Sequence, residues 1–202
     1  TELFTGKKEK AKTKELLHTL KVGGKRMVAF GSGASFSLKR WPKENFLELG
    51  QLLFDLGFYP VLMGGPGEEE AEWIAKESEG KVINIAGQLN FLETADFLSN
   101  VALAISNDSA IVHFAEAMGT PAIALFGPTV KEFGFGPFLE KSLLLDRELK
   151  CRPCSRNGKG TCNIKEELKC LRDISTEEVL LEALRIIGET SESQLLTPET
   201  GE

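Results

Sequence analysis

The chain has 202 residues, of which 42% are hydrophobic and 27% charged, and this is enough apolar material for one hydrophobic core. Its formal net charge of -6 provides no global positive field for a polyanion, so we expect no nucleic-acid partner. Its apolar stretches are too short to cross a bilayer and none reads as a signal peptide, so we expect a cytoplasmic protein.

From residue 27 onward, short β-rich runs alternate with amphipathic helical runs. Strands are predicted at residues 27–30, 59–63, 82–85, 101–106 and 121–126. Helices are expected between them: Pro42 lies in the first turn of one, Gly57 ends it, and Asn90 with Glu93 forms a capping box for another. This order of elements is typical of an α/β fold with a doubly wound parallel sheet, Rossmann-like in form.

The chain divides into three parts. Residues 1–26 are Lys-rich and are interpreted as a linker, or a helix without its neighbour, left from an interdomain region. Residues 27–188 form the predicted domain; a long irregular stretch at 127–170, with a cysteine-rich loop at 150–170, precedes a last helix at 176–187. Residues 189–202 have the composition of a disordered tail. Because the first residue is Thr1, we expect that an upstream portion has been removed.

The loop after the first strand, residues 31–40, has the chemistry of a phosphate site. Its small residues let backbone N–H groups approach an anion, and Lys39 and Arg40 supply positive charge. Phe36 stands where the dinucleotide fingerprint has its third glycine, and the loop lacks the Gly-Lys-Ser/Thr of a Walker loop. A flexible loop with two solvated cations remains the alternative.

Two further loops end at the same expected edge of the sheet. Residues 106–110 lead directly into a helix, so the Ser109 hydroxyl and the first free N–H groups can hold a second phosphate, although Asp108 or Ser109 can equally be an N-cap. His113 follows one helical turn later; a packed or surface role is its alternative. Glu68 suits the hydroxyls of a ribose, or serves only as a charge at a helix start.

Four motifs, taken in order and spacing, closely resemble the C-terminal domain of glycosyltransferase family 9, the ADP-heptose:lipopolysaccharide heptosyltransferases. They are Gly33-Ala34-Ser35 with Lys39-Arg40-Trp41-Pro42, Gly64-Gly65-Pro66-Gly67-Glu68, Asn107-Asp108-Ser109 with His113, and Phe126-Gly127-Pro128-Thr129. The resemblance covers residues 27–180. It implies that the chain is the C-terminal half of a GT-B architecture, in which two Rossmann-like domains face each other across a cleft, and that this half mainly holds ADP-heptose.

The resemblance also implies roles for individual residues. It puts Ala34 and Ser35 beside the diphosphate, Lys39 on the leaving-group phosphates, and Glu68 on the ribose. The diphosphate and sugar side would be lined by Asp108, Ser109, Ala110 and His113. The chain departs from the family pattern in having Gly31-Ser32 where many members have His-Pro, and Ala110 where the family usually has glycine. Ala110 would add a Cβ close to the ligand.

The implied reaction is an inverting single displacement without a cofactor or catalytic metal, in which Lys39 stabilises the departing ADP. The family's general base is an aspartate of the N-terminal domain, so we expect the chain alone to be inactive. The lipopolysaccharide inner core would be the acceptor, reached through the missing domain at the inner face of the bacterial inner membrane, with peripheral membrane contact.

Two other functions stay open: a nucleotide-sugar epimerase-like GT-B domain, and a non-catalytic nucleotide-binding or scaffold module. The four cysteines, Cys151, Cys154, Cys162 and Cys170, leave a further alternative. A Cys-x-x-Cys pair with two more thiols can hold a structural zinc that braces the loop, whereas free thiols or a reversible disulfide are the other interpretations.

Overall fold

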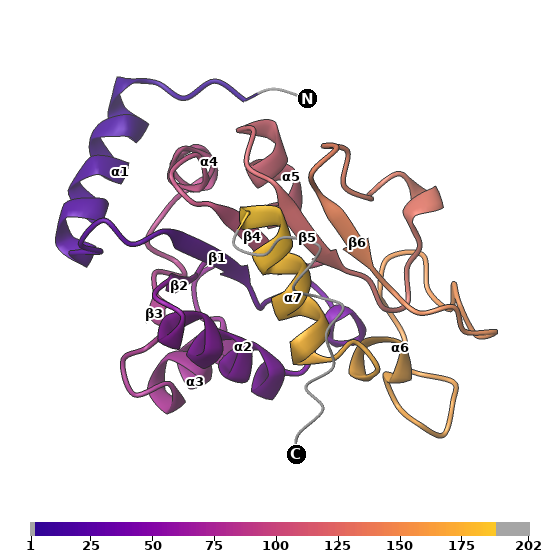
Figure 1. Cartoon of the computed structure of the whole chain (residues 1–202). Coiled ribbons are helices and arrows are strands. Elements are labelled where there is room, and N and C mark those ends of the chain that lie inside the picture. Colours follow the sequence, from indigo (N-terminus) through magenta and orange to yellow (C-terminus); the bar gives the residue numbers. More distant parts are fainter. Residues whose placement is uncertain (1–2, 189–202) are drawn as a thin grey trace, which may run out of the picture.

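The computed structural model describes residues 3–188, in which a parallel six-stranded sheet is covered by helices on both faces (Figure 1). The strand order is β3-β2-β1-β4-β5-β6. The strands are β1 (Met27–Gly31), β2 (Tyr59–Leu62), β3 (Ile83–Asn84), β4 (Leu103–Asn107), β5 (Ala122–Leu125) and β6 (Leu143–Leu145). All neighbouring pairs are parallel, which confirms the predicted doubly wound fold.

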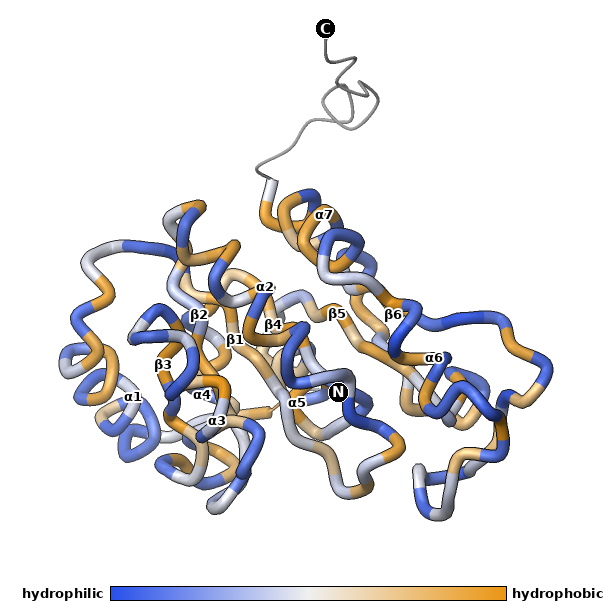
Figure 2. Tube along the Cα trace, turned by 90° about the horizontal axis from the view of Figure 1, so that it is seen from below, coloured by the Kyte–Doolittle hydropathy of each residue, from blue (hydrophilic) through white to orange (hydrophobic). Residues whose placement is uncertain are grey.

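Two groups of helices cover the two faces of this sheet. One face carries α2 (Lys43–Asp55), α3 (Glu69–Glu77) and α7 (Thr176–Ile187), and the other carries α1 (Lys7–Leu20), α4 (Phe91–Leu98) and α5 (Ala110–Ala117). Short helices are η1 (Ser37–Lys39), η2 (Lys131–Phe133) and α6 (Lys169–Arg172). Figure 2 shows the hydrophobic strands at the centre, between hydrophilic outer segments. No helix within residues 3–188 is long and apolar enough to span a membrane.

The side chains of β1 point alternately to the two faces of the sheet, so this strand contributes to both hydrophobic cores. Val28 and Phe30 belong to the core under α2 and α7, whereas Met27 and Ala29 belong to the core under α4 and α5. Successive side chains of a strand point to opposite faces, so a strand that is covered on both sides is apolar throughout. The continuous apolar run at residues 27–30 is the sequence signature of this position in the sheet.

Helix ends follow the predicted local chemistry. Asn90 and Glu93 form the expected capping box at the start of α4: the Asn90 side chain accepts the Glu93 N–H, and the Glu93 carboxylate accepts the Asn90 N–H. Gly57, after α2, has a φ of 89°, which favours glycine. Pro42 differs slightly from expectation, because it is the N-cap of α2 rather than a residue of the first turn.

The amino-terminal segment is part of the folded unit. Residues 1–26 were expected to be a linker or an unpartnered helix, but α1 packs beside α4 and buries Leu16 in the core of that face. The Thr5 hydroxyl donates a hydrogen bond of 2.6 Å to the Asp96 carboxylate on α4. The correction has a physical reason: the weak apolar stripe of a Lys-rich helix is sufficient when a neighbouring helix offers an apolar face. The predicted disordered tail, residues 189–202, lies outside the described residues.

The region at residues 127–170 is also more regular than predicted, because it contains η2 and the edge strand β6. Leu143 to Leu145 pair in parallel with Ile123 to Leu125 of β5. Just before this pairing, the Ser142 hydroxyl accepts the Ala122 N–H at 2.9 Å. A strand of three leucines has little local β preference, so the exposed edge of β5 decides its conformation.

Candidate functional site

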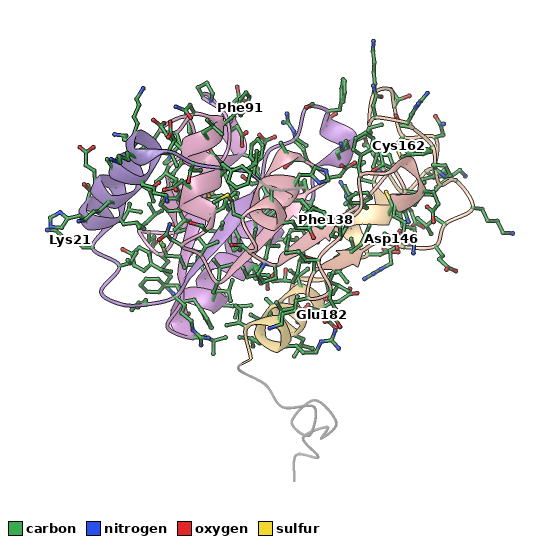
Figure 3. All side chains as sticks on the ribbon, turned by 90° about the horizontal axis from the view of Figure 1, so that it is seen from above. Lys21, Phe91, Phe138, Asp146, Cys162 and Glu182 are labelled. Carbon is green, nitrogen blue, oxygen red and sulfur yellow. The ribbon has the colours of Figure 1, made fainter. Side chains whose placement is uncertain are left out.

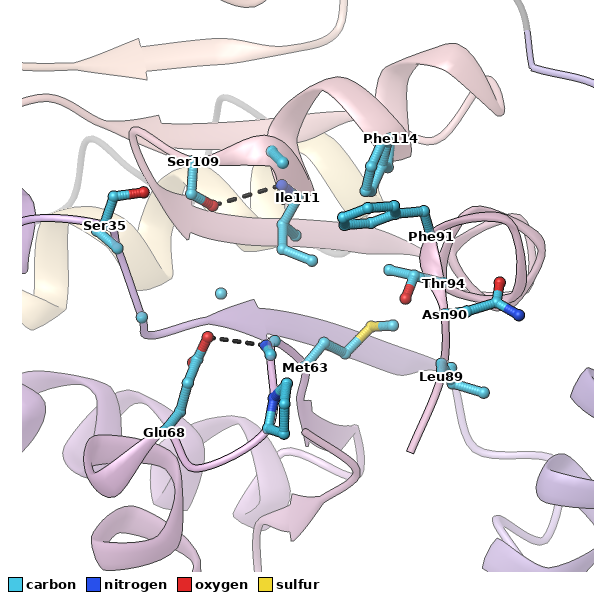
Figure 4. Close-up of a pocket in the computed structure, with 17 residues that line it drawn as sticks. Ser35, Met63, Glu68, Leu89, Asn90, Phe91, Thr94, Ser109, Ile111 and Phe114 are labelled. Carbon is cyan, nitrogen blue, oxygen red and sulfur yellow. Dashed lines mark hydrogen bonds between the residues drawn. The ribbon is translucent and has the colours of Figure 1, made fainter. Parts of the chain in front are cut away.

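A cavity of about 530 Å³ opens at the carboxyl edge of the sheet, beyond the ends of β1, β2 and β4 (Figure 4). Ser35, Glu68 and Ser109 gather at one end of this cavity, whereas the other end is mostly apolar. The apolar end is formed by Met63, Leu89, Phe91, Ile111 and Phe114, with Thr94 beside them. The volume and this division suit a small ligand with one apolar and one strongly polar part.

The loop after β1, residues 31–40, is held in place by the end of β4. The buried Asn107 side chain accepts the Trp41 N–H at 2.9 Å and donates to the Ser32 carbonyl at 2.7 Å. At Gly31 the two segments come so close that a Cβ would lie 2.2 Å from the Ser106 hydroxyl oxygen. The loop is therefore a shaped element rather than a flexible connection.

The two cations of this loop differ in their surroundings. Arg40 pairs with Glu70 and donates to the Ala34 carbonyl at 3.0 Å, so it shapes the loop. The Lys39 ammonium lies 2.8 Å from the Asp108 carboxylate, and only 14% of the Lys39 side chain is exposed. Neither cation is freely solvated.

Asp108 is held from two sides. Its Oδ2 atom receives both the Lys39 ammonium and a 2.7 Å hydrogen bond from the Thr129 hydroxyl. The N-cap of α5 is the neighbouring Ser109, whose hydroxyl oxygen accepts the Ile111 N–H at 3.4 Å. Asp108 is therefore not the N-cap, and it lies buried beside the start of α5.

Glu68 carries an unsatisfied carboxylate oxygen. Its Oε1 atom accepts the Gly65 N–H at 2.9 Å, whereas its buried Oε2 atom has no hydrogen-bond partner among residues 3–188. Burial raises the pKa of Glu68, and nearby Glu70 raises it further, although the backbone of Gly65, the charge of Arg40 and the backbone of Gly33 offset part of the increase. The carboxylate packs against Gly33 and Gly64, where any Cβ would approach it within 2.5 Å. The two glycines therefore make room for the carboxylate at the polar end of the cavity.

The structure brings most of the predicted site residues together. The cavity is lined by Ala34, Ser35, Glu68, Ser109 and Ala110. Lys39 and Asp108 are not in the lining; they form the ion pair next to it. His113 is also outside the lining, with its ring centroid 6.4 Å from that of Phe135.

Sequence analysis missed the apolar end of the cavity. Leu89 and Phe91 precede and begin α4, and Phe91 is 78% exposed while its ring lies 5.9 Å from that of Phe114 on α5. The available signal was an aromatic residue, Phe91, at a helix start in the connection that follows a parallel strand, where ligands bind at the carboxyl edge. This signal was overlooked because residues 90–93 were interpreted only as a helix-capping motif.

The four cysteines do not form the zinc site considered above. Within residues 3–188, no three His, Cys, Asp or Glu side chains are arranged to hold a metal ion, and all four cysteines are free thiols. Cys170 packs into the hydrophobic core, and the Cys162 sulfur accepts the Leu168 N–H at 3.4 Å. Burial raises the pKa of the Cys154 and Cys170 thiols, and neighbouring thiols raise it further. Because the described side chains form no metal-binding group, a structural zinc is not supported.

Comparison with known proteins gives a consistent result. Residues 2–165 match the model of the family described as Glycosyltransferase family 9 (heptosyltransferase). The lipooligosaccharide heptosyltransferase 2 of Haemophilus influenzae is 32% identical over 121 residues, which are 57% of this chain and 35% of the relative.

Two solved structures share the fold. The glycosyl transferase of family 9 from Veillonella parvula has a TM-score of 0.77 and 25% identity, over 94% of this chain and 54% of its own. The ADP-heptose lps heptosyltransferase II of E. coli has a TM-score of 0.74 and 24% identity, over 93% of this chain and 54% of its own. The chain thus spans about half the length of these two proteins.

Proposed function

We propose that this chain, which belongs to glycosyltransferase family 9, binds ADP-heptose as the donor for inverting transfer of heptose to the lipopolysaccharide inner core. The names of the similar proteins supply the sugar and the acceptor class. The chain's own contribution to this proposal is the cavity at the carboxyl edge of the sheet, whose two ends match the two chemistries of a nucleotide.

The observation that carries the proposal is the buried Oε2 atom of Glu68, which has no hydrogen-bond partner in the described part of the chain. A buried carboxylate oxygen without a partner is costly, and two vicinal ribose hydroxyls are donors that would satisfy it. In this arrangement the base would occupy the apolar end beside Phe91 and Met63. The diphosphate would meet the backbone at Ala34 and Ser35 and the amino terminus of α5.

The proposed chemistry assigns the chain to the leaving-group side. The acceptor hydroxyl attacks the anomeric carbon, the bond from that carbon to the β-phosphate oxygen breaks, and its electron pair goes to ADP. The Lys39 ammonium stabilises the added charge on ADP, Asp108 holds Lys39, and Ser109, Ala110 and His113 face the diphosphate and sugar. The base that removes the acceptor proton is proposed to come from the other domain of the full-length enzyme. Reaction with a lipopolysaccharide core would take place at the inner face of the inner membrane, through peripheral contact.

Nucleotide selectivity tests this function. We expect the 202-residue chain to bind ADP in titration calorimetry more tightly than UDP, but not to transfer heptose to a core acceptor by itself. Equal or better binding of UDP would favour the epimerase-like alternative, and absence of nucleotide binding would favour a scaffold. Measurable transfer by these residues alone would show that the base lies within them.

Replacing Glu68 by glutamine is expected to weaken ADP binding by about tenfold or more, because ribose hydroxyls donate more strongly to a carboxylate than to an amide. Calorimetry at neutral pH measures the loss. Glu72→Gln is the matched control, since Glu72 lies exposed on α3, the helix that follows Glu68, and does not line the cavity. Equal affinities of wild type and Glu68→Gln would remove Glu68 from the site.

The same pair of proteins tests the raised pKa of Glu68. Burial makes this carboxylate take up a proton at a higher pH than its ordinary value of 4.5. The affinity ratio between wild type and Glu68→Gln should therefore shrink during acidification before pH 4.5 is reached, and comparing the two proteins cancels the titration of ADP itself. The stability of the unliganded protein depends on pH in the opposite direction to the effect of Glu68 on ADP affinity. Because the pKa of Glu68 is higher in the folded state than in the unfolded state, its contribution to stability is fully present below the unfolded-state pKa and is lost as pH rises through the folded-state pKa. Unliganded Glu68→Gln should thus melt at a higher temperature at neutral pH.

A further inference from the structure

The segment at residues 151–158 is fastened to the turn that follows β5. The Arg152 guanidinium donates to the carbonyls of Gly127 and Thr129, the latter at 2.7 Å, and the Cys154 N–H donates to the carbonyl of Pro128 at 3.1 Å. Three consecutive carbonyl groups of the turn are thus bonded to residues 152 and 154. Figure 3 shows this end of the molecule, marked by Asp146 and Cys162, opposite Lys21.

Arg152 is itself buried and fully engaged. Its side chain is only 5% exposed, and besides the turn it donates to the Arg147 carbonyl and lies 3.0 Å from the Asp146 carboxylate. A guanidinium presents several N–H groups in a planar fork, so one side chain can bridge acceptors on different segments. A lysine has a single nitrogen and cannot reproduce this set of bonds.

The turn leads directly to the leaving-group lysine. Thr129, whose carbonyl is held by Arg152, donates its hydroxyl to Asp108 Oδ2, and the same oxygen receives the Lys39 ammonium. All three links are short, at 2.7, 2.7 and 2.8 Å, and Thr129 is 3% exposed. Little water can therefore replace any of these contacts.

A second contact reaches the other end of the Lys39 side chain. At Gly158, which has a φ of 88°, a Cβ would lie 2.5 Å from Cγ and Cδ of Lys39. Only a residue without a side chain leaves room for the aliphatic stem of the lysine here. The segment that contains Arg152 thus bounds Lys39 along its stem as well as through its ammonium.

We propose that Arg152 is a positioning residue for Lys39, which it orients through Thr129 and Asp108. This inference rests on the proposed function, in which Lys39 stabilises the departing ADP. The positive charge of Arg152 is used within the protein rather than on the substrate, because its donors point to carbonyls and to Asp146. An ammonium held in advance where charge develops acts mainly in the transition state, so misplacing it should lower kcat more than donor affinity.

A double-mutant cycle in the full-length enzyme tests the chain of contacts. Thr129→Val keeps the shape but loses the hydroxyl, and we expect kcat to fall about tenfold, whereas Thr129→Ser, which keeps the hydroxyl, should retain most of the rate. Because the effect passes through Lys39, Thr129→Val in a Lys39→Ala background should change kcat by less than about twofold. Arg152→Lys should show the same dependence on Lys39. A merely structural defect would lower the rate to the same degree in both backgrounds.

Arg147→Lys is the matched control for Arg152→Lys. Arg147 is a half-buried arginine that binds Glu178 and the Asp173 carbonyl, away from the turn. If Arg152→Lys does not fold, as melting would show, Thr129→Val still tests the inference. Unchanged kcat in Thr129→Val, additive losses in the cycle, or an equal loss in Arg147→Lys would overturn it.

The proposed function can fail separately from this inference. Wild-type enzyme that does not transfer heptose from ADP-heptose would refute the function alone. In that case the double-mutant cycle would be measured as ADP affinity by calorimetry. Thr129→Val should then weaken ADP binding severalfold when Lys39 is present and should have no effect in the Lys39→Ala background. Additive effects on affinity would overturn the positioning role in that case.

Discussion

Replacing Lys39 by alanine in the full-length enzyme is expected to lower turnover by about a hundredfold or more. The Lys39 ammonium is already fixed beside Asp108, with most of its side chain shielded from water, so it needs no reorganisation when charge develops on the departing ADP. A cation in such surroundings stabilises an anion more strongly than the same cation in water. Steady-state kinetics with ADP-heptose measures the loss, which should appear mainly in kcat.

Lys43→Ala is the control for this experiment. Lys43 lies on α2, four residues further along the chain, where its ammonium stacks over the Trp73 ring at 4.2 Å and does not line the cavity. Its removal should leave turnover within about twofold of wild type. Thermal melting of Lys39→Ala must accompany the kinetics, since Asp108 loses its ion-pair partner. A folded Lys39→Ala enzyme with normal turnover would show that Lys39 has only a structural role.

Replacing Trp41 by alanine is expected to lower the free energy of unfolding by about 3–5 kcal/mol, a large fraction of the stability of a domain. Trp41 is 1% exposed and packs edge-on against Phe46 of α2, with 5.0 Å between ring centroids. Its indole N–H donates to the Ile174 carbonyl at 2.9 Å, which joins the end of the loop after β1 to the segment just before α7. Urea unfolding of the 202-residue chain, with an unchanged slope, measures the effect.

Two phenylalanine substitutions separate the causes of this effect. Trp41→Phe retains a large ring but leaves the buried Ile174 carbonyl without its donor, and should cost about 1–3 kcal/mol. Trp73→Phe, at the partly buried second tryptophan, should cost less than Trp41→Phe, because no hydrogen bond of its indole is lost among the described contacts. A Trp41→Ala protein within about 1 kcal/mol of wild type would contradict the assignment of Trp41 to the structural core.

Much of the fold was accessible from local patterns. The five predicted strands, β1 to β5, and the helices between them were found from short apolar runs, which are continuous in β1 and β4 because these strands are covered on both faces. The predicted capping box at Asn90 was also correct, because it depends only on residues three apart. The strand β6 was missed and the packing partner of α1 was not foreseen, because both elements have weak patterns of their own and are stabilised by the edge of β5 and by α4.

The candidate site likewise has features that the local sequence indicated and features that only tertiary contacts determine. Small residues, cations and a helix start at the ends of parallel strands indicated a phosphate site; the small residues and the helix start line one cavity, whereas the cations Lys39 and Arg40 do not. The partners of each side chain were not predictable, because Lys39, Asp108 and Thr129 are far apart in the chain and meet only through the sheet. The cysteine spacing was compatible with zinc, but the described side chains form no metal-binding group, and Cys170 packs into the hydrophobic core.

The sequence by itself determined the alternation of strands and helices, the edge at which the loops gather, and the family resemblance carried by four motifs. These properties depend on periodicity and on short-range residue chemistry, which act before the chain has folded. Only the tertiary structure decided that Arg40 shapes a loop while Lys39 faces Asp108. It also decided that Glu68 keeps one carboxylate oxygen without a partner among residues 3–188, and that Arg152 binds the turn at Thr129. The pairing of buried polar groups depends on which segments become neighbours, and for contacts between residues 39, 108, 129 and 152 that is settled by the order of strands in the sheet.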